Sequence, residues 1–217
     1  MPELNDQNFY YKDFRGRLLG NKAREQLVLE EVSGLGRQDF FLEVGCAQGH
    51  FVGKARRFSE NVFGGEYELG KMPAAKRLFP GCHFLGINAE ALPFKAGSFD
   101  FVLCTEVLEH VPDWEAAFQE LLRVSRKRVL VTVPLENGLF WRAISKVRSM
   151  ESRGHLHSLD SRALEEKLGK QWKVLKKEIV STPRPRLNRL IGKRASERLG
   201  LYTLLLLEKK PHTKQFI

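Results

Sequence analysis

The stretch that decides the fold is FFLEVGCAQG, residues 40–49. Its first half, residues 40–44, is apolar and predicts a short strand, with an acidic residue, Glu43, one step before the end. The strand gives way to a turn with Gly45 and Gly49, and residues 50–58 then read as a helix. Because glycine has no Cβ and tolerates positive φ, such a turn lets the backbone come close to a ligand. In an open α/β sheet, ligands bind at this end of the strands.

Three further strands are expected downstream, and each runs into polar residues. A second strand, 61–65, ends in Glu66, about 20 residues after the turn, where a carboxylate can accept hydrogen bonds from both hydroxyls of a ribose. A third strand, 82–87, runs into Asn88-Ala89-Glu90, and a fourth, 98–105, into EVLEHVPD, residues 106–113. Alternating strands and helices predict a parallel sheet, whose strand ends converge at one edge.

Three strings of this sequence match successive motifs of the class I S-adenosylmethionine-dependent methyltransferases in order and spacing. They are LEVGCAQGHF (42–51), NAEALPFKAGSFDFVLCTEVLEHVPD (88–113) and RKRVLVTVP (126–134), and the resemblance covers about residues 38–180. The chain thus resembles the type 11 methyltransferases. The resemblance implies an α/β, Rossmann-like sheet of seven mostly parallel strands, with helices on both faces and an antiparallel last strand. It also implies S-adenosyl-L-methionine as cofactor, and says little about the methyl acceptor.

The resemblance assigns roles to several residues. Glu43 would lie near the ammonium of the cofactor, Glu66 would bind the ribose hydroxyls, and Asn88 would meet the adenine amino edge. The family usually has Asp at position 88, so Asn88 is a departure that keeps an acceptor and gains a donor. Each polar residue also has a structural alternative, such as capping a helix or a turn. The cofactor-binding set implied is Glu43, Gly45, Cys46, Ala47, Gly49, Glu66, Tyr67, Asn88, Ala89, Glu90, Cys104, Thr105 and Glu106.

A dinucleotide-dependent dehydrogenase is the main competing interpretation, because its cofactor also lies on a strand, a glycine turn and a helix with a ribose-binding acid. Its fingerprint is GxGxxG. Here Ala47 stands where a middle glycine would be, and the third position after Gly49 is Val52, with Gly53 displaced by one. The NAEALPF and EVLEH segments also have no natural place in a dehydrogenase.

His110 is the candidate catalytic base, just past the fourth strand. A metal is the alternative, because Glu106, Glu109 and His110 stand at i, i+3 and i+4 and would share one face of a helical turn. With a distant histidine, His155 or His157, this resembles the ExxEH pattern of the small-RNA 2′-O-methyltransferases and the ubiquinone-pathway O-methyltransferases. The resemblance implies a divalent ion on Glu106, Glu109, His110 and His157. Our first interpretation is that the protein binds no metal, since the EVLEH segment is common in related methyltransferases that have none.

The remaining elements complete one domain over residues 1–217. A helical cap (1–36), in which Gly16 and Gly20 are expected to split a helical stretch over 10–32, precedes a cofactor-binding half (37–134). The acceptor-side half (135–217) is expected to hold helices at 138–149 and 160–169, a strand at 172–180, a loop at 181–187 and a strand at 201–208. The last two strands predict an antiparallel hairpin, with a reversed strand at the edge of the sheet.

Charge is unevenly distributed along the 217 residues. Residues 1–140 hold 17 Lys and Arg against 19 Asp and Glu, whereas residues 141–217 hold 19 against 7. The basic third indicates either a polyanion nearby or only a well-solvated surface. No apolar run approaches 18 residues, and the first residues lack a signal-peptide pattern, so a cytoplasmic location is expected. Three cysteines without CxxC spacing predict small buried side chains and no zinc site.

The sequence therefore predicts an enzyme that methylates a small-molecule, lipid or saccharide acceptor on oxygen or nitrogen. An RNA methyltransferase is the alternative, supported by the basic third and weakened by the lack of a recognisable RNA-binding module. A non-catalytic cofactor-binding partner subunit is a third. The acceptor pocket is expected between residues 106–110, the segment 135–158 and the aromatic residues Phe9, Tyr10 and Tyr11.

Overall fold

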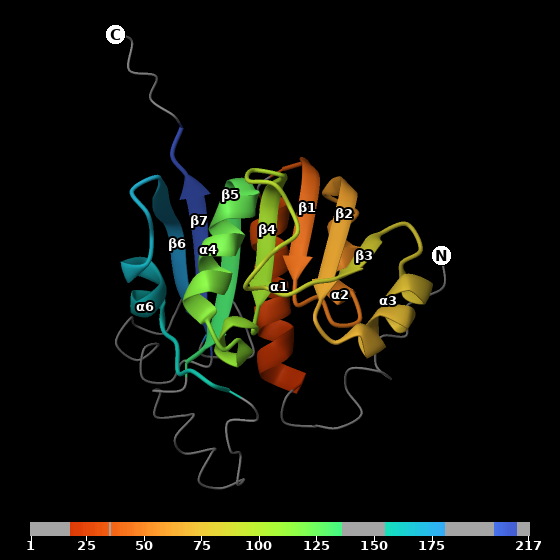
Figure 1. Ribbon diagram of the computed structural model, residues 1–217, viewed down its shortest axis with the longest axis horizontal. Coiled ribbons are helices and arrows are strands. Elements are labelled where there is room, and N and C mark those ends of the chain that lie inside the picture. The colour runs from red at the N-terminus through yellow and green to blue at the C-terminus, as the bar shows by residue number, and fades with distance from the viewer. Residues whose placement is uncertain (1–17, 35, 136–154, 181–201, 212–217) are drawn as a thin grey trace, which may run out of the picture.

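The computed structural model describes residues 18–34, 36–135, 155–180 and 202–211. They form a seven-stranded sheet in the order β3-β2-β1-β4-β5-β7-β6 (Figure 1). Its strands are β1 (Gln38–Val44), β2 (Ser59–Glu66), β3 (His83–Gly86), β4 (Phe99–Thr105), β5 (Ser125–Pro134), β6 (Trp172–Val180) and β7 (Tyr202–Lys209). The helices are α1 (Leu18–Gly34), α2 (His50–Ala55), α3 (Met72–Leu78), α4 (Trp114–Val124) and α6 (Ser161–Glu166), with 3₁₀ turns η1 (Leu69–Lys71) and η2 (Leu108–His110).

The sheet confirms the predicted fold and corrects one detail of its edge. Strands β1 to β5 pair in parallel, and β7 is antiparallel to both β5 and β6. The reversed strand is therefore one place in from the edge, and β6 is the edge strand. The burial patterns explain this arrangement: Leu204 to Leu207 are all buried, so β7 needs cover on both faces, whereas β6 carries lysines that suit an exposed edge.

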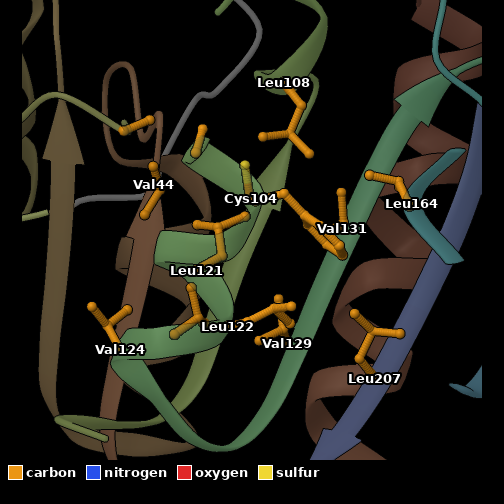
Figure 2. Close-up of a cluster of buried hydrophobic side chains, with 14 of the residues drawn as sticks. Val44, Cys104, Leu108, Leu121, Leu122, Val124, Val129, Val131, Leu164 and Leu207 are labelled. Carbon is orange, nitrogen blue, oxygen red and sulfur yellow. The ribbon is translucent and has the colours of Figure 1, made fainter. Parts of the chain in front are cut away.

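Helices cover both faces of the sheet, as predicted. One core cluster joins α4 and α6 to the front of the sheet in Figure 1, through Phe118, Leu121 and Leu164. Figure 2 shows Leu121 and Leu122 of α4 in one cluster of buried side chains with Val129 and Val131 of β5. A second cluster on the opposite face packs α1, α2 and α3 against the alternate strand residues. Period-two alternation along the strands thus supplies both cores.

Helix α1 differs from its predicted form, because Gly20 lies inside it instead of splitting it. A glycine in a helix costs only about 1 kcal/mol relative to alanine. The burial of Leu27, Val28 and Val32 against the sheet outweighs that cost. Gly16, Phe9, Tyr10, Tyr11, the helix predicted at 138–149 and the loop predicted at 181–187 lie outside the described residues. In the described ranges, none of the helices has the length and apolarity needed to cross a membrane.

The amino ends of the central strands are joined by one buried carboxylate, Asp100 of β4. It accepts hydrogen bonds at 3.0 Å from the backbone N–H groups of Asp39 and Phe40 in β1. Arg126 of β5 binds both carboxylate oxygens at 2.7 Å, and Lys127 lies 2.7 Å from one of them. The charge that burial would penalise is therefore fully compensated at this edge.

Candidate active site

The turn after β1 is held to the end of β2. The N–H groups of Gly45 and Cys46 both donate to the Gly65 carbonyl, at 2.8 and 3.0 Å. Gly45, Ala47 and Gly49 all have positive φ, at 77°, 47° and 80°. A Cβ on Gly45 would come within 2.2 Å of the Val107 side chain, so the turn packs tightly against the residues that follow β4. Glycine is therefore required at position 45 for both space and conformation.

Glu66 lies directly across this turn, at the carboxyl end of β2. Its side chain is buried, and one carboxylate oxygen accepts a hydrogen bond from the Ala47 N–H at 2.7 Å. The other oxygen accepts from the Glu68 N–H at 2.9 Å. Each oxygen of a carboxylate has two lone pairs, so both retain capacity to accept from a ligand. The structure thus brings together the glycine turn and the predicted ribose-binding acid.

Glu43 is buried beneath the turn, and its carboxylate accepts a hydrogen bond at 3.1 Å from the N–H of Val52 in α2. Burial raises the pKa of Glu43 well above its ordinary value, and the nearby Glu66 carboxylate raises it further. The Val52 N–H and Arg24 oppose this effect in part. The structural alternative for Glu43, a carboxylate that accepts from a backbone N–H of the next helix, is therefore present in the structure. A contact of Glu43 with the ammonium of a ligand stays a prediction.

Asn88 is exposed just past β3 and forms a local turn. Its side-chain oxygen accepts from the Glu90 N–H at 3.0 Å, and its amide group donates to the Glu90 carboxylate at 3.3 Å. The other Glu90 oxygen accepts from the Asp113 N–H at 2.8 Å, which ties this turn to the start of α4. Ala89 is buried, and Tyr67 is 77% exposed beside Glu66. Asn88 caps its turn as the structural alternative expects, and its adenine contact stays a prediction.

Glu106, directly after β4, is the second non-glycine residue with positive φ, at 53°. Its carboxylate accepts from the Thr132 hydroxyl at 3.0 Å and pairs with Arg24 of α1 at 3.3 Å. Burial raises the pKa of Glu106, and Arg24 opposes that rise. The Arg24 guanidinium also lies 5.0 Å from the ring centre of Tyr202 in β7. Helix α1 thus delivers a cation to the carboxyl edge of the sheet, next to Cys104 and Thr105.

Arg24 was not among the residues predicted from the sequence. The only signal for it is its place on α1: it stands three and four residues before Leu27 and Val28, which are buried. A charged residue on the apolar face of a helix is uncommon without a partner in the fold. The partner, Glu106, is 82 positions away and could not be identified from the sequence.

Glu109, His110 and His155 converge beside η2. Their donor atoms all lie within 4.8 Å of one another, and the Glu109 side chain is fully buried. The His110 and His155 rings meet edge to face with centroids 4.7 Å apart, and His110 Nε2 lies 3.9 Å from Glu109 Oε1. The predicted base, His110, is 42% exposed, so it lies where an acceptor could reach it.

The other two members of the predicted metal set are bound elsewhere. His157 Nε2 lies 3.0 Å from the Pro112 carbonyl oxygen, and Glu106 pairs with Arg24 and Thr132. The metal-capable group found among the described residues contains His155 in place of His157 and lacks Glu106. The structure therefore joins only part of the predicted set.

Neither the thiols nor the surface hollow at β3 gives further evidence for the site. Cys46 and Cys104 are buried, as predicted, whereas Cys82 is half-buried, and all three thiols are free. Burial raises the pKa of the Cys46 and Cys104 thiols, and nearby carboxylates add to the effect. A shallow hollow of about 530 Å³ lies at β3 and includes Phe63 and His83, but none of its lining residues belongs to the predicted site.

Comparison with known proteins shows similarity to methyltransferases. Residues 42–132 match a family described as a methyltransferase domain. An uncharacterised protein of Methanocaldococcus jannaschii is 32% identical over 149 residues, which are 63% of this chain and 62% of that protein. A probable S-adenosylmethionine-dependent methyltransferase of Mycobacterium tuberculosis is 23% identical over 63% of this chain and 46% of its own length. The chain thus spans less than two thirds of both curated relatives.

The fold also recurs in solved structures. The magnesium protoporphyrin IX methyltransferase of Synechocystis, solved with bound S-adenosylhomocysteine, superposes with a TM-score of 0.68 at 14% identity. The superposition covers 88% of this chain and 84% of that one. At this identity the likeness concerns the fold alone.

Proposed function

We propose that this chain is a class I S-adenosylmethionine-dependent methyltransferase, which binds S-adenosylmethionine at the carboxyl edge of its sheet and methylates a small-molecule, lipid or saccharide acceptor. The observation that supports this most is the buried Glu66 carboxylate, held across the glycine turn by the N–H groups of Ala47 and Glu68. That position suits the hydroxyls of a ribose, which a nucleoside cofactor carries.

The charges at this edge suit a cationic nucleoside better than a dinucleotide. S-adenosylmethionine carries a sulfonium and an ammonium and no phosphate. Two buried carboxylates, Glu43 and Glu66, lie at the turn, and burial together with Glu66 already raises the pKa of Glu43. A cation nearby would lower that electrostatic cost, whereas a pyrophosphate would increase it. The residues present therefore fit the proposed cofactor.

The chain contributes mainly by positioning the reactants. S-adenosylmethionine supplies a methyl group already activated on sulfur, so the acceptor attacks the methyl carbon in line and the carbon–sulfur bond breaks. The rigid turn at residues 45–49 and the end of β4 at residues 104–106 would fix the donor side, an effect worth up to about 7–11 kcal/mol in model reactions. His110, exposed at the mouth, would take the proton from an acceptor that arrives protonated.

A small acceptor is favoured over RNA by the lysines of the described acceptor-side half. Four of them, on or next to α6 and β6, already pair with glutamates, which reduces their attraction for a polyanion. These pairs are Lys167–Glu115, Lys173–Glu208, Lys176–Glu31 and Lys177–Glu165. RNA is the alternative acceptor, because residues 141–217 hold 19 Lys and Arg against 7 Asp and Glu. The intact acid and glycine positions argue against a non-catalytic subunit.

Calorimetry with the purified chain tests the proposal. The chain should bind S-adenosylmethionine and S-adenosylhomocysteine, and Glu66→Ala should weaken binding by about 1–3 kcal/mol, the cost of losing hydrogen bonds at a buried group. Glu68→Ala is the matched control, because Glu68 contributes only its backbone N–H to Glu66 while its exposed side chain pairs with Lys71. Binding of a nicotinamide dinucleotide in place of S-adenosylmethionine, or a larger loss in the Glu68 variant, would contradict the assignment.

A further inference from the structure

We propose that Glu109, His110 and His155 bind one divalent transition-metal ion, through one carboxylate and two imidazoles. The donor atoms of all three residues lie within 4.8 Å of one another. Ligands on a single ion at about 2.0–2.2 Å can lie up to about 4.4 Å apart, so small side-chain rotations bring the three onto one ion. The role of such an ion in methyl transfer rests on the proposed function, whereas its binding does not.

The backbone holds the distant histidine in place. The Glu109 carbonyl accepts hydrogen bonds from the N–H of Leu156 at 2.7 Å and of His157 at 3.3 Å. His157 Nε2 lies 3.0 Å from the Pro112 carbonyl oxygen, which adds a third contact between this segment and the turn around η2. These contacts hold the residues next to His155 against Glu109 and Pro112, and so keep His155 close to Glu109 and His110. Such preorganisation lowers the cost of assembling a metal site.

The same contacts decide which residues can be ligands. His157 contacts the Pro112 carbonyl, and His155 lies at the cluster. Glu106 is likewise engaged by Arg24 and Thr132. The site has one carboxylate where the sequence pattern predicts two.

This difference changes the metal that the site prefers. Magnesium favours sites made of oxygen ligands and water. Two imidazoles and one carboxylate suit manganese, iron, cobalt, nickel or zinc instead, and leave positions open for other ligands. An ion at an open position can fix an acceptor and lower the pKa of its hydroxyl group. His110, at 42% exposed, places such open positions toward solvent.

Cobalt(II) titration of the full chain tests the proposal directly. Chelator-treated protein should take up one equivalent of Co²⁺, with visible absorption bands that report nitrogen ligation. Tenfold more Mg²⁺ should not displace it. His155→Gln and Glu109→Gln should each weaken Co²⁺ binding at least about tenfold, and Mn²⁺ should compete with Co²⁺ for the site.

His157→Gln is the matched control, since it changes a histidine that is not a proposed ligand and its side-chain amide can still donate to the Pro112 carbonyl. The Co²⁺ affinity of this variant should stay within about threefold of the wild type. Urea denaturation of each variant shows that the fold is intact and keeps this test separate from the proposed function. Three outcomes overturn the site: no stoichiometric Co²⁺ uptake, equal losses in the His155 and His157 variants, or displacement by Mg²⁺. Loss of S-adenosylmethionine binding in the wild type would instead overturn the proposed function alone.

Discussion

The pKa values of carboxylates are shifted in opposite directions at the two edges of the sheet. At the amino edge, Asp100 is surrounded by two backbone N–H groups, Arg126 and Lys127, and these partners hold its pKa well below the ordinary range despite burial. At the carboxyl edge, Glu43 is buried and Glu106 is partly buried, with fewer compensating groups, and burial raises the pKa of both.

The difference separates stability from binding. A buried carboxylate whose charge is matched by the protein ties strands together and needs no ligand. A buried carboxylate that remains under-compensated costs stability, and a positively charged ligand lowers that cost when it binds. Perturbed pKa values of this kind concentrate at functional sites. Under the proposed function, the cationic cofactor would lower that cost at the carboxyl edge, whereas the amino edge needs no ligand.

Asp100→Asn should produce the largest effect on stability. The change leaves Arg126 and Lys127 beside a neutral group and removes the charge that fixes them at the ends of β1, β4 and β5. We expect the free energy of unfolding to fall by about 3 kcal/mol, measured by urea denaturation. S-adenosylmethionine affinity should be unchanged below the melting temperature. A large loss of affinity in the folded variant would show that the two edges are not independent.

Gly45→Ala should come second and should act at the carboxyl edge. The added Cβ would lie 2.2 Å from Val107 Cγ2, and alanine is disfavoured at φ 77°. We expect a stability loss of about 2 kcal/mol together with loss of cofactor binding. Combining it with Val107→Ala removes the clash and leaves the strained φ, so about half of the stability should return. Full recovery would assign the role of Gly45 to space alone; no recovery would assign it to conformation.

Glu43→Gln should stabilise the protein by about 1–2 kcal/mol near neutral pH, because it removes an under-compensated buried charge and keeps an acceptor for the Val52 N–H. In the wild type the folded-state pKa of Glu43 is raised, so its contribution to stability is full below its ordinary value of 4.5 and is lost as the pH rises above it. The advantage of the variant should therefore grow from pH 5 to pH 8. Urea denaturation at both values measures it.

Asp100 supplies the internal comparison for that experiment, because its pKa is lowered. Its contribution is present above its ordinary value of 3.8 and is lost as the pH falls below it. The loss of unfolding free energy caused by Asp100→Asn should therefore become smaller as the pH falls below 3.8. The gain caused by Glu43→Gln should also become smaller as the pH falls, but this decrease should begin at a higher pH. If the Glu43 variant gains nothing at any pH, the two edges are equally compensated and the comparison fails.

Lysines of β6 should have the smallest effect. Lys173 and Lys177 pair with Glu208 and Glu165, so their charge is already partly compensated. Replacing both by glutamine should change the affinity for a single-stranded RNA oligonucleotide by less than about twofold. Fluorescence anisotropy at 50 and 200 mM salt measures affinity and salt dependence together. A steep salt dependence that these changes reduce would favour the RNA acceptor.

Local sequence signals were enough to predict most of the fold. Apolar strands, each followed by a glycine turn or by polar residues, predicted β1 to β4 and their order in the chain. The insertion of β7 between β5 and β6 was missed, because pairing partners depend on which face of each strand must be buried. Gly20 was misjudged for a similar reason, since helix propensity is a weak prior against tertiary packing.

The candidate site was predictable only where its residues are close in sequence. The glycine turn and Glu66 follow from spacing alone, and the structure brings them together. Arg24 and the choice of His155 over His157 depend on contacts between segments far apart in the chain. A periodic pattern indicates which side of a segment a residue occupies, but it does not indicate which other segment lies there.

The position of β7 has a consequence for how the chain is made. Strand β6 is joined to the sheet only through β7 in the part of the chain that the structure describes, yet β7 follows it in the sequence. During synthesis, β5 must therefore keep its apolar edge open and β6 must wait without a partner until residues 202–209 have emerged. Open strand edges of this kind are where nascent chains aggregate or recruit chaperones. The lysines of β6 would keep this unpaired strand soluble before β7 is made, so their charge would matter during synthesis as well as in the folded sheet.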